Sequence, residues 1–188
     1  ALIFTNLQCL RYGGNAAVAC YAAISYIVFP VQYFLTGIGE GVQPLISFYH
    51  GAKKETEVRA VKKIAHTAEI ILGITAAAVT ICMIPYIGGW FGLSAESKQY
   101  FSSGMLISSF AFLLTGTAKL NVSCLNAVMQ TKKAVFMTYI ESLAVSPICL
   151  FLLPAVWDIR GIWLALPATA GIMTVIYGLI RKDRKNEE

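Results

Sequence analysis

Residues 37–54 read GIGEGVQPLISFYHGAKK, an apolar run that glycine and proline interrupt and that two lysines close. Glycine and proline allow a helix to bend, and lysines mark the place where a helix leaves the membrane. A soluble core rarely needs both features in this order, whereas a membrane helix that bends and ends at the cytoplasmic face does. The stretch therefore predicts a bent helix that spans a membrane.

The composition of the whole chain agrees with a membrane protein. Its residues are 57% hydrophobic and 13% charged, and its mean hydropathy is +0.65. Soluble domains carry about 25% charged residues. The net charge of +5 is divided into short groups between apolar runs, so it does not form the continuous basic face of a nucleic-acid-binding protein.

Long apolar segments divide the chain into membrane spans. Residues 1–10 supply only about half of the roughly 20 residues that a crossing needs, which indicates a sequence truncated at its N-terminus. We expect five full spans at about residues 15–49, 64–86, 100–130, 134–156 and 161–180. A charged cytoplasmic tail is expected at residues 181–188. The predicted fold is an all-α integral membrane protein, a polytopic helix bundle.

Basic residues in the loops predict the orientation, because Lys and Arg are retained on the cytoplasmic side. The loops on one side carry Lys53, Lys54, Arg59, Lys62, Lys63, Lys132, Lys133, Arg181, Lys182, Arg184 and Lys185. The opposite loops carry only Arg11, Lys98 and Arg160. We therefore expect the C-terminus in the cytoplasm.

No metal or cofactor site is expected. The cysteines lie in apolar runs without a CxxC pair, so we expect them to fill space in the core. His66 and Glu69 stand three residues apart on one helical face, a spacing that can bind metal, but no third ligand is apparent. We expect them to be an interfacial polar pair where their helix enters the membrane.

Two ionisable residues lie deep in apolar segments. Lys119 and Glu141 stand eleven residues before and after Gln130, the expected turn, so each lies about 16 Å from that turn, near the bilayer midplane. An unpaired charge there costs roughly 2.5 to 3.5 kcal/mol. We predict that Lys119 and Glu141 form a buried ion pair that lines the interior of the helix bundle. The pair would have either a packing role or a role in coupling to ion movement. The expected polar lining around it is Thr115, Ser123, Asn126, Thr138 and Ser142.

Small residues and aromatic rings each allow two interpretations. Gly37, Gly39, Gly41 and Pro44 could form a hinge for alternating access or simply allow close helix packing. The aromatic side chains could line a pocket for flat aromatic cations, or they could serve only in packing and in anchoring at the membrane interface. They are Tyr21, Tyr26, Tyr33, Phe101, Phe110 and Phe112. Trp90 and Trp157 fit the anchoring role.

Three motifs resemble the multidrug and toxic compound extrusion (MATE) family of transporters. The stretch at 37–54 is similar to that family's glycine-rich helix end and the loop after it, and YGGNAAVACYAA at 12–23 is similar to the start of the same helix. A GxW-x-A-x-P pattern recurs in Gly161, Trp163, Ala165 and Pro167. The resemblance covers essentially the whole chain.

This resemblance implies one six-helix lobe, the C-terminal one, of a two-lobed transporter that exports drugs by cation-coupled antiport. The implied partners are the lipid bilayer, the missing N-terminal lobe, small organic cationic drugs, and Na⁺ or H⁺. The implied location is a bacterial-type plasma membrane, crossed several times. No nucleophile and base, phosphate loop or metal cluster suggests an enzyme.

Two other functions stay open. A lipid-linked oligosaccharide flippase of the same superfamily would need a cavity ringed by arginines, and the spans contain none. A non-transporting membrane fragment or scaffold would pack against other membrane proteins.

Overall fold

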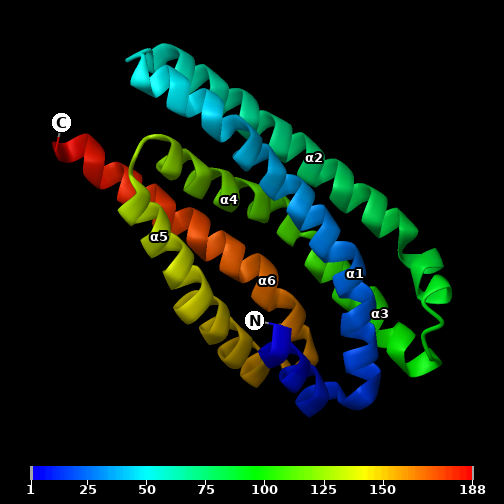
Figure 1. Cartoon of the computed structure of the whole chain (residues 1–188). Coiled ribbons are helices and arrows are strands. Elements are labelled where there is room, and N and C mark those ends of the chain that lie inside the picture. The colour runs from blue at the N-terminus through cyan, green and yellow to red at the C-terminus, as the bar shows by residue number, and fades with distance from the viewer. Residues whose placement is uncertain (1, 188) are drawn as a thin grey trace.

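The computed structural model describes residues 2–187, with side chains through residue 180. Within that part every regular element is helical, in the order α1 (Leu2–Gly51), α2 (Glu55–Trp90), α3 (Ala95–Ser109), α4 (Ala111–Ala127), α5 (Thr131–Ile140), η1 (Glu141–Val145) and α6 (Ser146–Glu187). Figure 1 shows these helices packed side by side in one bundle. The expectation of an all-α membrane bundle is confirmed.

The long helix α1 changes direction at Gly14. This residue has φ 61° and ψ −159°, a conformation that glycine adopts without steric cost. The segment before Gly14 turns back across the bundle (Figure 1), where the ring of Phe4 lies 6.1 Å from that of Phe151. The backbone stays helical through Pro30 and from Gly37 to Pro44, so Gly14 supplies the break in this helix.

A second break reverses the chain within α6. Asp158 has φ 48° and ψ −136°, and the two parts of α6 on either side of it run in opposite directions (Figure 1). Gly161 packs so tightly in this turn that a Cβ atom would collide with the carbonyl group of Leu153. The turn therefore requires glycine at position 161.

The segment expected as a single span at 100–130 is a bent pair of helices. It starts earlier, at Ala95, and bends by 40° between α3 and α4. Phe110 lies at the bend, where its N–H donates to the carbonyl of Ile107 at 3.2 Å. No glycine or proline occupies the bend, which explains why the sequence did not reveal it.

Several stretches could cross a membrane. Among the described residues, three continuous helical stretches are long and apolar enough, and the bent α3–α4 pair is a fourth candidate: Leu2–Gly51, Glu55–Trp90, Thr131–Ile180 and Ala95–Ala127. The third of these contains the reversal at Asp158. The division into five full spans stays our prediction.

The main core of the bundle is formed by side chains of α1, α2, α3, the start of α4, and α6. Phe101, Met105 and Phe112 are at most 1% exposed there, together with Cys9 and Cys20 of α1. The outer face instead exposes large apolar side chains, among them Tyr33, Phe34, Ile70, Ile71 and Ile74. Such a surface suits hydrocarbon as the surrounding solvent.

The basic turns gather at one end of the bundle. The α1–α2 turn with Lys53, the α4–α5 turn with Met129 and the C-terminal end of α6 lie together there (Figure 1). The α2–α3 turn and the breaks at Gly14 and Asp158 lie at the other end (Figure 1). The start of α5, which carries Lys132 and Lys133, therefore lies at the same end of the bundle as the α1–α2 turn with Lys53 and Lys54.

Candidate functional site

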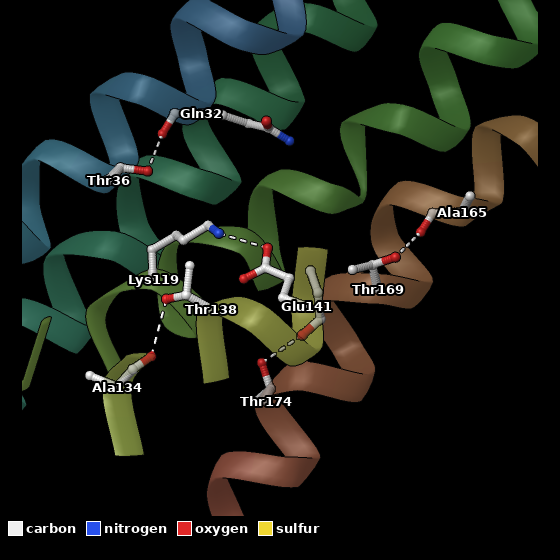
Figure 2. Close-up of polar contacts among 10 residues, drawn as sticks. Gln32, Thr36, Lys119, Ala134, Thr138, Glu141, Ala165, Thr169 and Thr174 are labelled. Atoms are coloured by element: carbon white, nitrogen blue, oxygen red, sulfur yellow. Dashed lines mark hydrogen bonds and ion pairs between the residues drawn. The ribbon is translucent and has the colours of Figure 1, made fainter. Parts of the chain in front are cut away.

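The structure brings Lys119 and Glu141 together across two neighbouring helical segments. Lys119 Nζ, on α4, donates to Glu141 Oε1, at the start of η1, over 2.6 Å. Figure 2 shows the two side chains pointing toward one another. Their side chains are 34% and 21% exposed, so the pair lies on an open face of the lobe rather than in a sealed core.

Glu141 begins a π-helical turn, a feature that the sequence reading missed. The N–H of Ser146 donates to the carbonyl of Glu141, five residues earlier, which widens the helix by one residue. Pro147 follows directly and has no N–H to offer to the carbonyl of Leu143. Such turns are rare and often occur at functional sites, and Pro147 was the signal in the sequence.

The other polar residues expected around the pair take different surroundings. Thr115 and Ser123 are buried on α4, and Asn126 is half-buried. Thr138 and Ser142 are exposed, and Thr138 Oγ1 donates to the carbonyl of Ala134 at 3.1 Å. Their role as cavity lining stays a prediction.

Gln32 is a polar residue of α1 that the sequence analysis did not single out. It projects from α1 in Figure 2, and its carbonyl accepts from Thr36 Oγ1 at 2.9 Å. Its buried Nε2 has no hydrogen-bond partner within the described residues. The signal in the sequence was the side-chain amide of Gln32 itself, because it interrupts an apolar run.

The glycines of the opening stretch differ in their surroundings. A Cβ on Gly39 would lie 3.0 Å from Ser123 Oγ and 3.2 Å from Leu120 Cα, so α1 and α4 approach closely there. Gly37 and Gly41 face open space, and Pro44 is exposed. Gly39 therefore has a packing role that the other two glycines lack.

A sequence model of the MatE family matches residues 2–151. The chain belongs to the MatE family. Its members are membrane transporters, which fits the apolar outer face and the basic turns of this lobe. Among curated proteins, none matches this chain.

Solved structures match the fold of this MatE chain closely. An outward-facing multidrug resistance MATE transporter of the MOP superfamily gives a TM-score of 0.88 at 14% identity over 97% of this chain and 42% of its own. A mutant of VcmN, a MATE transporter of Vibrio cholerae, gives a TM-score of 0.87 at 22% identity, over 99% of this chain and 42% of its own.

A third solved structure is a MOP superfamily transporter of Pyrococcus furiosus, described as having a binding pocket of reverse polarity that suggests a different function. It gives a TM-score of 0.86 at 14% identity over 97% of this chain and 42% of its own. The MatE chain thus spans about two-fifths of the length of the solved transporters it matches.

The expected interfacial position of Glu69 in this MatE chain is wrong. Glu69 is 2% exposed and lies in the middle of α2, against Gly116 of α4. Because α2 begins at Glu55 and not near Ile64, Glu69 is about 21 Å along the helix. The spacing of four from Ala65 through Glu69 to Gly73 was the signal for a buried stripe.

The aromatic residues of the MatE lobe divide between core and surface. Phe101 and Phe112 are 1% exposed, and Tyr21 stacks on Trp163 with ring centroids 6.2 Å apart. Exposed rings instead occur at Tyr26, Tyr33, Phe110, Trp90 and Trp157. Tyr26 stacks on Phe91 at 6.0 Å beside a cavity of about 570 Å³.

Proposed function

We propose that this chain is the C-terminal lobe of a secondary multidrug antiporter that couples drug export to inward flow of Na⁺ or H⁺. Membership of the MatE family and the length ratio to the solved transporters support one lobe of a two-lobed molecule. The transport step would be a rocking motion of two lobes around a central cavity. The missing N-terminal lobe would be the partner.

The observation that carries the proposal is the Lys119–Glu141 ion pair on an open face of a membrane bundle. Ionisable groups inside membrane segments are costly and typically face a partner or a water-filled cavity. The 2.6 Å pair and its partial exposure fit a cavity between lobes. Binding or release of a cation near the pair would change its strength, which gives coupling a physical basis.

We also propose a plasma membrane location of bacterial type, with the C-terminus in the cytoplasm. The basic turns that gather at one end of the bundle support this orientation, because Lys and Arg are retained on the cytoplasmic side. Lys53, Lys132 and Lys133 would then face the inner surface.

Transport by the intact protein in proteoliposomes tests the proposal. A pH gradient and a Na⁺ gradient are imposed separately, and uptake of a fluorescent organic cation is followed with and without an ionophore that collapses the gradient. We expect one gradient to drive uptake and the ionophore to abolish it. The chain expressed alone should show no efflux, because it has no partner lobe.

The variant that neutralises both charges, Lys119→Met with Glu141→Gln, tests the role of the pair. We expect its ion dependence to change, with Glu96→Gln in an exposed first turn of α3 as the control. Unchanged drug export and ion dependence would limit the pair to packing. Absence of any gradient-driven transport by the intact wild type would refute the antiporter proposal and favour a scaffold.

A further inference from the structure

Glu69 is a buried acid that the ion pair does not use. Its side chain is 2% exposed, and neither Oε1 nor Oε2 has a hydrogen-bond partner within the described residues. Buried carboxylates normally accept hydrogen bonds or face a cation, because an uncompensated charge is strongly destabilising away from water. The surroundings of Glu69 therefore disfavour its ionised form.

The helices α2 and α4 lie in close contact at Glu69. A Cβ on Gly116 would lie 3.4 Å from Glu69 Cδ and 3.5 Å from its Oε2. One turn along α2, a Cβ on Gly73 would lie 2.7 Å from the carbonyl oxygen of Phe112. The carboxyl group is thus held against the backbone of α4 at Gly116.

Among the residues that the structure describes, no charged side chain forms an ion pair with Glu69. On α4, the charged residue within two turns of Gly116 is Lys119, and its Nζ lies 2.6 Å from Glu141 Oε1. On α2 the titratable groups within two turns are Lys62, Lys63 and His66, and none forms an ion pair or hydrogen bond with Glu69. On α1, the side chains of Tyr33 and Glu40 are exposed.

A second unpartnered oxygen lies on the facing helix. Thr115 Oγ1 is buried, has no hydrogen-bond partner within the described part of the chain, and is adjacent in sequence to Gly116. A hard metal ion such as Ca²⁺ requires six or more oxygen ligands, far more than these groups supply. A proton requires only one covalent bond to a carboxylate oxygen. The geometry therefore favours a proton over a metal ion.

We propose that Glu69 is a proton-binding site of this lobe, separate from the Lys119–Glu141 pair. The carboxyl group carries a proton while α2 and α4 are packed, and loss of the proton leaves a carboxylate that weakens this helix contact. The inference deepens the proposed function, because it assigns the coupling ion at this position to H⁺.

Infrared difference spectroscopy and thermal unfolding of the intact transporter test the site without any transport assay. In wild type at pH 6 we expect the carbonyl band of a protonated carboxylic acid, and we expect Glu69→Gln to lack it. Glu96→Gln, which changes an exposed acid, should keep the band. The melting temperature of wild type should fall by about 5–10 °C more than that of Glu69→Gln between pH 6 and pH 9.

The readouts separate failure of this inference from failure of the antiporter proposal. A wild-type spectrum without the acid band at pH 6 would overturn the inference, as would equal pH slopes of melting in wild type and Glu69→Gln. Loss of the band on adding Na⁺ at constant pH would overturn it in favour of a metal ion. If Glu69→Gln does not fold, the wild-type spectra at pH 6 and pH 9 are compared. Loss of the acid band at pH 9 supports the inference, and an unchanged spectrum overturns it. None of these results depends on drug transport.

Discussion

The two single substitutions that remove Lys119 or Glu141 should together cost more stability than the double substitution that removes both. An unpaired charge at the bilayer centre costs about 2.5 to 3.5 kcal/mol, and partial exposure of both side chains reduces that cost. Glu141 is the less exposed partner, at 21% against 34%, so Lys119→Met, which strands Glu141, should be the more harmful change. We expect it to cost about 2 kcal/mol, and Glu141→Gln about 1 kcal/mol.

The double variant should cost less than the sum of the two single changes by about 1 kcal/mol, because it leaves neither charge without a partner. Equilibrium unfolding of the intact transporter in mixed detergent micelles, followed by tryptophan fluorescence, measures this difference. The charge exchange, Lys119→Glu with Glu141→Lys, should recover much of the stability. Single costs that add to within about 0.3 kcal/mol would show that the two side chains do not stabilise one another.

Further substitutions test the packing of the lobe. Gly39→Leu should destabilise it by about 1–3 kcal/mol because the new side chain meets Leu120 of α4, whereas Gly37→Leu faces open space and should not destabilise it; equal unfolding free energies of the two variants would contradict this contact. Gly73→Ala should also destabilise the lobe, since its Cβ would lie 2.7 Å from a carbonyl oxygen, and unchanged thermal unfolding would refute that approach. Ser94→Ala should cost about 1 kcal/mol, because Ser94 Oγ caps α3 by accepting from the N–H three residues later at 3.2 Å, and Ser102→Ala on an exposed face is the control.

The sequence predicted the bundle and its central pair because both follow from local rules. Apolar runs and basic loops report membrane helices directly, and equal distances from the turn near Gln130 placed Lys119 and Glu141 at one depth. The break at Gly14 and the reversal at Asp158 fall between expected spans.

Other features depend on tertiary packing, which the pattern of apolar runs and basic loops does not report. The bend at Phe110 has no glycine or proline to mark it, and the π-helical turn at Glu141 depends on hydrogen bonding that the apolar pattern does not report. The position of Glu69 was misjudged because the span was expected to begin at about residue 64, which placed Glu69 at the membrane entry, whereas the helix already begins at Glu55. Helix propensity and tertiary contacts extend α2 beyond its apolar part.

Accessibility of single cysteines in intact cells tests most directly the claim that this lobe spans a membrane with its basic turns inside. Cysteines are introduced into the intact transporter at Lys53 and Lys132, in the basic turns, and at Gly92 and Asp158, at the opposite end, and are labelled with a reagent that cannot cross the membrane. We expect the reagent to label positions 92 and 158 in intact cells, and positions 53 and 132 only after the cells are opened. Labelling of positions 53 and 92 from the same side of an intact membrane would contradict the account.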